Sequence, residues 1–254
     1  MSEFVFDSIQ STPWSRWKAW FRACLAPPTC ELCESLVPQV PALCPDCAEG
    51  LQLLGAALCA RCALPFSATD SRPHLCGVCL AKPPSFEKAV SVFRFEKSAA
   101  QLLHRVKFSG RIQAFAPFFP EAAVKFRNMV ESFAPERILP MPLSWRRRFR
   151  RGFNQSAVLA EELQRRSGCR IPWGPPVRRR FMTPQARKNR AERLQAMRGA
   201  FQVRHNEIWR GRRVLLVDDV LTTGASADAL SAALLRAGAQ RVQVFTLARV
   251  GRRI

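Results

Sequence analysis

Residues 214–226, VLLVDDVLTTGAS, constrain the fold more than any other part of this sequence. An apolar run ends in two adjacent carboxylates, Asp218 and Asp219, and a loop of small residues then leads into a helical pattern. The apolar run is typical of a strand buried on both faces of a parallel sheet. Because ligands bind at the carboxyl ends of parallel strands, the acids and the loop predict a binding site.

The residue types in this segment predict a phosphorylated ribose as ligand. Ionised carboxylates accept hydrogen bonds from hydroxyls, so Asp218 and Asp219 can hold a cis-diol such as the ribose 2′ and 3′ hydroxyls. Unpaired N–H groups and the dipole at a helix N-terminus favour a phosphate. The residues expected to cradle it are Thr222, Thr223, Gly224, Ala225 and Ser226. The segment lacks the Gly-Lys-Ser/Thr ending of a Walker A loop, and the alternative interpretation is a strand end with two solvated acids.

The surrounding sequence alternates strand and helix patterns. Strands are expected over 89–95, 137–143, 212–219 and 241–250, and helices over 98–108, 120–133, 154–168 and from Ser226 to near Gly238. Strand, helix and strand in this order imply right-handed crossovers and a parallel sheet. The predicted fold class is therefore α/β, a parallel sheet with flanking helices.

Eight of the ten cysteines form four Cys-x-x-Cys pairs, which predict metal binding. Two such tight turns aim four thiolates at one ion, so the spacing predicts two structural zinc ions, one per quartet. The predicted ligands are Cys30, Cys33, Cys44 and Cys47 for one ion, and Cys59, Cys62, Cys76 and Cys79 for the other. Spacing alone leaves crossed pairing between the quartets open, and iron–sulfur ligation is the alternative chemistry.

The N-terminal sequence lacks the features of a secretory signal, because it begins with acidic residues and has no continuous apolar run. No stretch approaches the roughly 18 uncharged apolar residues of a spanning helix, so no transmembrane segment is expected. We therefore expect a cytoplasmic protein, in which reduced thiols bind metal. The length of 254 residues suggests two domains. The expected organisation is an amphipathic helical segment at 1–27, a double zinc ribbon at 28–84 and an α/β domain at 85–254.

The net charge of +21 is concentrated in residues 146–213, which contain 20 Lys or Arg and four acidic residues. Such a stretch attracts polyanions, including pyrophosphate groups and nucleic acid, or it is simply a solvated surface. Four aromatic residues in or beside it are candidates for stacking on bases: Trp145, Phe149, Phe153 and Trp173.

With these motifs the chain resembles the ComF (GntX-like) family of phosphoribosyltransferase-like proteins, which are associated with competence and DNA uptake. The resemblance includes LPMPLSWRRRFRRGFNQSAVLA at 139–160, HRVKFSGR at 104–111 and MRGAF at 197–201. It implies a type I phosphoribosyltransferase-like fold that binds 5-phosphoribosyl-1-pyrophosphate (PRPP). It further implies that Arg151, Gly152 and Asn154 lie near the pyrophosphate, and that residues 178–198 cover the site.

The resemblance implies two functions. One is Mg²⁺-dependent transfer of phosphoribose from PRPP to an unidentified nitrogen acceptor, with Asp218 and Asp219 favouring the positive charge that develops on the ribose. The other is a non-catalytic adaptor that binds single-stranded DNA and competence or DNA-processing proteins on the same fold. No Ser/His/Asp or Cys/His arrangement indicates a different catalytic chemistry.

Overall fold

The computed structural model describes residues 28–38, 43–66, 74–179 and 200–251. The predicted amphipathic segment at 1–27 lies outside the described residues. So does the predicted cover at 178–198, except for its first two residues.

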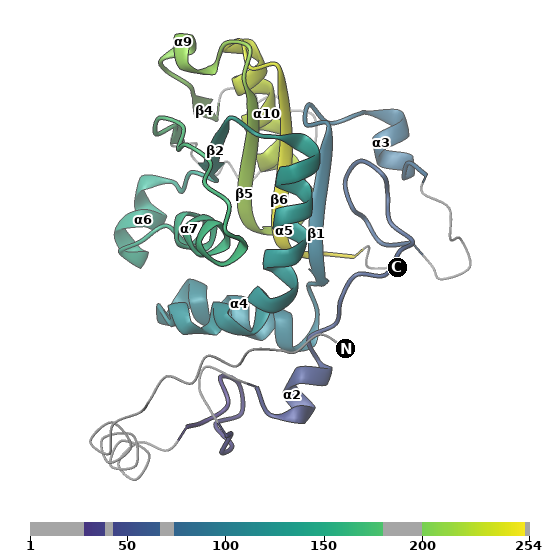
Figure 1. Ribbon diagram of the computed structural model, residues 1–254, viewed down its shortest axis with the longest axis vertical. Helices are drawn as coiled ribbons and strands as arrows, with labels where there is room; N and C mark the ends of the chain where they lie inside the picture. The colour runs from purple at the N-terminus through teal and green to yellow at the C-terminus, as the bar shows by residue number, and fades with distance from the viewer. Residues whose placement is uncertain (1–27, 39–42, 67–73, 180–199, 252–254) are drawn as a thin grey trace, which may run out of the picture.

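Four parallel strands form the central sheet, as the alternation of strand and helix patterns predicts. They are β1 (Lys88–Arg94), β2 (Arg137–Pro140), β5 (Arg213–Leu221) and β6 (Arg241–Arg249). Their order is β1-β6-β5-β2, with β5 and β6 in the centre (Figure 1). Val217 of β5 lies between Phe245 of β6 and Pro140 of β2. The predicted strand at 137–143 ends early, so its last three residues belong to the loop beyond β2.

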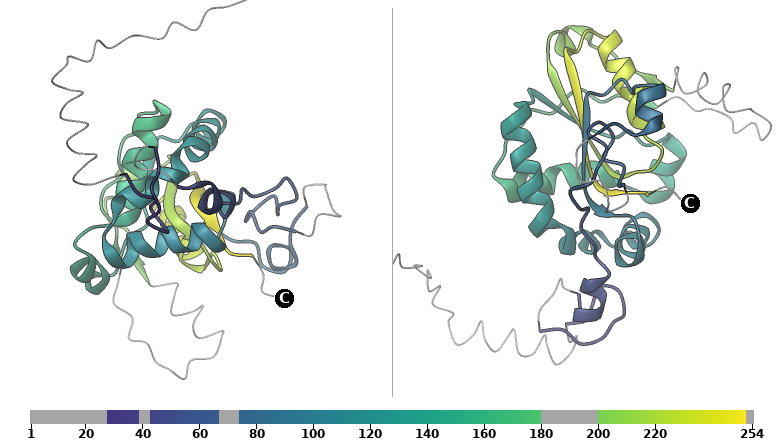
Figure 2. Two further views of the ribbon diagram at one scale, coloured as in Figure 1. Left: turned by 90° about the horizontal axis from the view of Figure 1, so that it is seen from below. Right: turned by 90° about the vertical axis from the view of Figure 1, so that its right-hand side faces the viewer.

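Helices cover both faces of the sheet. The helices α4 (Lys97–Ser109), α5 (Phe119–Phe133) and α7 (Gln155–Ser167) lie on one face, and α10 (Ala225–Arg236) lies on the other (Figure 2). The remaining elements are short: α2 (Pro45–Glu49), α3 (Gly77–Ala81), the 3-10 helix η1 (Ile112–Phe118), α6 (Trp145–Arg151), β3 (Arg178–Arg179), β4 (Phe201–Gln202) and α9 (Asn206–Trp209).

The alternation of side chains along β5 divides the interior into two cores. Leu215 and Val217 pack with α4, α5 and α7, while Val214 and Leu216 pack with α10. All four side chains are fully buried, as expected for a central strand covered on both faces.

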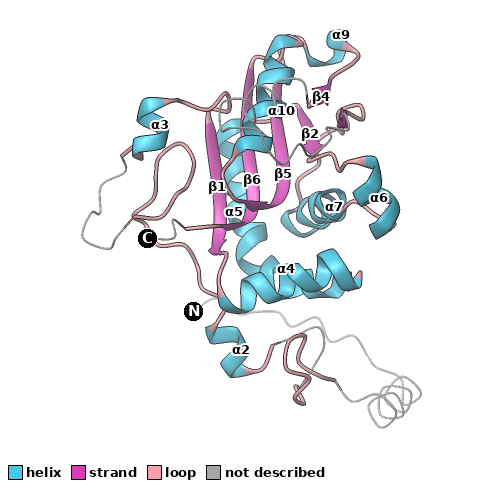
Figure 3. Cartoon of the chain, turned by 180° about the vertical axis from the view of Figure 1, so that it is seen from behind, coloured by secondary structure: helices cyan, strands magenta, loops and turns pink. Residues whose placement is uncertain are grey.

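The cysteine-rich module wraps around the β1 edge of the sheet. Leu53 pairs with Phe93 in an antiparallel bridge, and the N–H of Leu54 donates to the carbonyl of Val92 at 2.8 Å. This pairing covers backbone groups that an edge strand would otherwise expose. The part of the module before this pairing packs on one face of the sheet, and the part after it packs on the other face. The helices α2 and α3, which belong to these two parts, therefore lie far apart (Figure 3). The module and the α/β domain therefore share both cores.

In the part of the chain that the structure describes, no helix combines the length and the apolar character needed to span a bilayer.

Candidate functional site

A cavity of about 330 Å³ opens at the carboxyl ends of β2 and β5. It brings together most of the residues predicted to bind ligand: Asp218, Asp219, Thr222, Thr223, Gly224, Ser226 and Arg151. The other residues that line it are Lys107, Phe108, Met141, Pro142, Leu143, Arg150, Gln155, Arg179, Val220, Leu221 and Ala227. The cavity therefore combines two carboxylates from β5 with cationic side chains from α4, α6 and β3.

The two acids have different partners. The Oδ1 atom of Asp218 accepts hydrogen bonds from the hydroxyl of Ser156 and from the N–H of Asp219, both at 2.9 Å. The Oδ2 atom of Asp219, which is 3% exposed, lies 2.9 Å from Nζ of Lys107. Burial and the charge of Asp219 raise the pKa of Asp218 to about 7, against the hydrogen bonds from Ser156 and Asp219 and the charge of Lys107. Asp218 therefore changes charge near neutral pH.

Residues 222–226, which we call the phosphate loop, connect β5 to α10. Gly224 has a φ of 79°, a conformation that favours glycine, and α10 begins at the next residue. The hydroxyl of Thr223 accepts a hydrogen bond from the N–H of Ala225 at 3.3 Å. Ala225 is the first residue of α10 and does not line the cavity. The helix N-terminus and its unsatisfied donors thus lie beside the two acids.

Of the residues expected near the pyrophosphate, only Arg151 lines the cavity. Gly152 ends α6 with a φ of 76°, and its N–H donates to the carbonyl of Arg148. Asn154 caps α7 by accepting from the N–H of Ser156 at 3.1 Å, and it donates to the carbonyl of Met141 at 3.2 Å. Gly152 and Asn154 thus shape the loop beyond β2, and their contact with a ligand stays a prediction.

Several side chains that line the cavity have no role predicted from the sequence patterns. Lys107 and Phe108 come from the C-terminal part of α4, within the HRVKFSGR segment. Phe108 is 58% exposed at the rim, where the guanidinium carbon of Arg151 lies 5.6 Å from the ring centroid. Gln155 is 4% exposed and follows Asn154 in the RGFNQ segment. Both segments belong to the motifs of the family resemblance, and this is the sequence signal that could have identified these residues.

The aromatic residues considered for base stacking differ in their surroundings. Phe149 is 88% exposed on α6, and Trp173 is 46% exposed beside β2. Phe153 instead packs against the core under α7. The side chain of Trp145 lies outside the described residues. Phe149 is therefore the most accessible of the three described aromatic side chains.

The eight paired cysteines form two separate groups of four. We call Cys30, Cys33, Cys44 and Cys47 the first cysteine quartet, and Cys59, Cys62, Cys76 and Cys79 the second cysteine quartet. Within each quartet all four Sγ atoms lie within 4.8 Å of one another, which fits one tetrahedral ion. The predicted grouping is confirmed, and the pairs do not cross between quartets.

Backbone donors around the thiols support metal binding. The N–H of Leu32 points to Sγ of Cys30 at 3.4 Å, and the N–H of Cys76 points to Sγ of Cys59 at 3.3 Å. Within the second cysteine quartet, burial raises the pKa of Cys62 and Cys79, whereas backbone N–H groups lower the pKa of Cys59 to about 6 against the effect of its burial. A thiolate is the form that binds metal, so each quartet is suited to a structural zinc ion.

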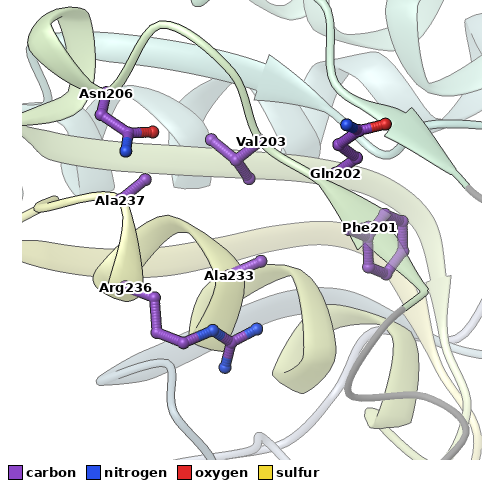
Figure 4. A pocket seen from close by; sticks show the side chains of 7 residues that line it. All are labelled: Phe201, Gln202, Val203, Asn206, Ala233, Arg236 and Ala237. Carbon is purple, nitrogen blue, oxygen red and sulfur yellow. The ribbon is translucent and has the colours of Figure 1, made fainter.

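A second cavity, of about 300 Å³, lies between β4 and α10 (Figure 4). Its lining combines the polar side chains of Gln202, Asn206 and Arg236 with the apolar side chains of Phe201, Val203, Ala233 and Ala237. It contains none of the residues predicted to bind a ligand.

Two domain families match this chain. Residues 21–80 match the double zinc ribbon domain family, and residues 154–254 match the phosphoribosyl transferase domain family. The chain is 36% identical to the DNA utilization protein YhgH of Escherichia coli O6:H1 over 196 residues, 76% of this chain and 84% of that protein. It is 32% identical to Competence protein F of Haemophilus influenzae over 181 residues, 68% of this chain and 78% of that protein.

Among solved structures, a purine phosphoribosyltransferase from Pyrococcus horikoshii aligns with a TM-score of 0.33 and 15% identity. The alignment covers 52% of this chain and 73% of that one, and the likeness is too weak to carry an inference.

Proposed function

The chain belongs to the ComF and YhgH family of competence and DNA utilization proteins, and on that premise we propose that it binds PRPP and transfers its phosphoribosyl group to a nitrogen acceptor. The observation that carries the proposal is the position of Asp218 and Asp219 beside the phosphate loop in one cavity.

Each part of PRPP has suitable partners in the cavity. The carboxylates of Asp218 and Asp219 accept hydrogen bonds from the 2′ and 3′ hydroxyls of the ribose, and the phosphate loop receives the 5′-phosphate at the N-terminus of α10. Arg150, Arg151 and Arg179 line the cavity and supply positive charge for the pyrophosphate. These groups are complementary to a ligand that carries a diol between two separated anionic groups.

The reaction breaks the bond between C1 of the ribose and the pyrophosphate oxygen, and forms a bond from C1 to the nitrogen lone pair of the acceptor. The acceptor loses a proton, and pyrophosphate departs with the electron pair of the broken bond. Positive charge develops on the ribose, close to the carboxylates of Asp218 and Asp219, and negative charge develops on the leaving group near Arg151. Mg²⁺ bound with PRPP would neutralise part of the pyrophosphate charge.

Calorimetric titration of PRPP with Mg²⁺ into the protein tests the binding step. We expect saturable binding that the Asp218→Asn/Asp219→Asn double variant weakens at least about tenfold, because neutral amides attract the hydroxyls less strongly. A matched control is Glu136→Gln, which removes a carboxylate from the opposite, N-terminal end of β5. Equal PRPP affinity in the double variant and the native protein would contradict the proposed site.

The transfer step requires a separate assay. Release of pyrophosphate from PRPP is measured with ammonia and with free nucleobases as acceptors, in the native protein and in both variants. Release that depends on the acceptor and is lost in the double variant supports a transferase. Tight binding without release in any acceptor mixture would contradict transfer while leaving PRPP binding intact.

A second function, a single-stranded DNA adaptor, is favoured by the exposed ring of Phe149. This residue is 88% exposed on α6 between Arg148 and Arg150, a combination of stacking surface and positive charge that suits single strands. We expect binding of a fluorescent oligonucleotide to weaken with salt and with Phe149→Ala, and to survive Asp218→Asn/Asp219→Asn. DNA binding unaffected by Phe149→Ala and by salt would contradict this function.

A further inference from the structure

Arg249 is a buried cation at the carboxyl end of β6, only 5% exposed. A buried guanidinium is costly unless hydrogen bonds and an opposite charge offset the loss of hydration. Among the residues that the structure describes, no carboxylate forms an ion pair with it. Its compensation must therefore come from other groups.

The donors of Arg249 connect two parts of the molecule that lie far apart in the sequence. Its Nε atom donates to the carbonyl of Cys62 at 2.9 Å, and Nη2 lies 3.9 Å from Sγ of the same residue. Its Nη1 atom donates to the carbonyl of Leu221 at 2.9 Å and to the carbonyl of Thr222. One side chain thus joins the second cysteine quartet to the first residue of the phosphate loop.

The missing counter-charge is supplied by the second cysteine quartet when it binds metal. Four thiolates around one divalent ion leave about two negative charges, and a cation in contact with a ligating sulfur offsets part of them. Cys62 and Arg249 are both buried, so water screens this attraction little. A metal ion in the quartet therefore favours the position of Arg249 in which it holds the carbonyls of Leu221 and Thr222.

We propose that Arg249 is a positioning residue that couples the second cysteine quartet to the phosphate loop. Metal bound by the quartet fixes the guanidinium, and the guanidinium fixes the carbonyls of Leu221 and Thr222. This orients the following N–H groups toward a phosphate monoester, and the inference rests on the proposed function in identifying that ligand as the 5′-phosphate of PRPP. The zinc module thereby sets the affinity of the site without touching the ligand.

Arg105 offers a matched control, because it makes the comparable link from the first cysteine quartet. Its Nη1 and Nη2 atoms donate to the carbonyls of Glu31 and Leu32, both at 2.6 Å. It lies on α4, whose fully buried residues Leu102 and Leu103 hold that helix in place independently. Arg105→Lys should therefore disturb a zinc ribbon without moving the phosphate loop.

Hydrogen–deuterium exchange of the ligand-free protein gives the first test. We expect Arg249→Lys, prepared with its full zinc content, to speed amide exchange in residues 221–226. The single ammonium of lysine cannot bind the carbonyls of Leu221 and Thr222 and the carbonyl of Cys62 at the same time. Arg105→Lys should leave exchange in these residues unchanged. Equal exchange of residues 221–226 in native protein and Arg249→Lys would overturn the proposal, and this readout does not depend on PRPP.

The affinity for PRPP with Mg²⁺ gives the second test. Arg249→Lys should weaken binding at least about tenfold, and Arg105→Lys by less than about twofold. Equal weakening by both variants would overturn the coupling and indicate general destabilisation. If the native protein binds no PRPP, the proposed function fails, while the exchange experiment still decides whether Arg249 orders the loop.

A spectroscopic measurement on the native sequence covers the case in which Arg249→Lys fails to fold. The protein is loaded with ¹¹³Cd in place of zinc, and the two cadmium resonances are followed during addition of PRPP and Mg²⁺. We expect the resonance of the second cysteine quartet to shift and that of the first to stay. A saturating titration that moves neither resonance would overturn the coupling.

Discussion

The ammonium of Lys107 lies 2.9 Å from Oδ2 of Asp219, so a cation from the end of α4 compensates the more deeply buried of the two site acids. The pair joins the C-terminal part of α4 to the C-terminal part of the central strand β5. Burial and the charge of Asp219 raise the pKa of Asp218 to about 7, so the charge of Asp218 depends on pH near neutrality. Stability and ligand binding should therefore respond differently to changes at these two carboxylates.

Removal of the Lys107 charge should destabilise the protein through Asp219. We expect Lys107→Met to lower the free energy of unfolding by about 1 to 3 kcal/mol in urea denaturation, because it leaves a buried carboxylate without its partner. The double variant Lys107→Met/Asp219→Asn should recover most of this loss. Additive losses in the double variant would show that the two side chains do not interact.

The raised pKa of Asp218 makes stability fall as pH rises. The folded protein holds the proton up to about pH 7, whereas the unfolded chain releases it near 3.8, so stability declines between these values and is constant above them. Asp218→Asn keeps an oxygen to accept from Ser156 and should raise the free energy of unfolding at pH 8 by about 1 to 3 kcal/mol. Urea denaturation from pH 4 to 8 measures the difference, which should shrink toward pH 4. A gain of equal size at pH 4 and pH 8 would show that titration of Asp218 is not its cause.

PRPP affinity should change with pH in the opposite direction. Ionised Asp218 accepts hydrogen bonds from the ribose hydroxyls, so binding should strengthen as pH rises through about 7. Titration of the phosphate ligand itself contributes near pH 6 and is common to all variants. Calorimetry across this range should show the Asp218 contribution as the part of the pH dependence that Asp218→Asn loses.

Gly224 should tolerate a methyl group poorly. Its φ of 79° is unfavourable for alanine, although a Cβ there would meet only Phe86 at ordinary contact distance. We expect Gly224→Ala to cost about 1 kcal/mol of stability and to weaken PRPP binding, because the strain is relieved by moving the phosphate loop. Gly55→Ala, with open space around its Cβ and no positive φ, is the control in thermal unfolding and calorimetry.

Metal analysis should find two zinc ions per chain, one for each quartet. Cys33→Ser, which alters an exposed ligand of the first quartet, should reduce the content to one and leave the second ion in place. Chelation of both ions should lower the melting temperature, because Cys30 and Cys59 belong to the two cores of the molecule. An unchanged melting temperature after complete chelation would contradict a structural role.

Much of the fold could be predicted because its elements have clear local patterns. The helix expected at 98–108 is found as α4, and the strand expected at 212–219 is found as β5. The cysteine quartets were predictable since two residues between thiols suffice to identify each tight turn. That Asp218 and Asp219 lie beside residues 222–226 in one cavity was predictable because they adjoin one another in the sequence, and their contact with a ligand stays a prediction.

The remaining features depend on contacts between distant residues. Lys107 could not be assigned to Asp219 because nothing in the helical pattern of α4 shows which strand end it meets. Arg249 has the sequence appearance of a surface cation near the end of a strand, and only the tertiary structure shows that it is buried between Cys62 and Leu221. The path of the cysteine-rich module around β1 likewise could not be predicted, because its residues lack regular periodicity.

The strand order β1-β6-β5-β2 has a consequence for protein synthesis. Within the sheet, β1 pairs with β6 and β2 pairs with β5, and both of these central strands leave the ribosome after β1 and β2. The two cysteine quartets can bind metal early in synthesis, but the complete sheet on which they pack does not yet exist. Assembly of the sheet is therefore a late event in synthesis, and until then the apolar strands β1 and β2 lack their partners in the sheet.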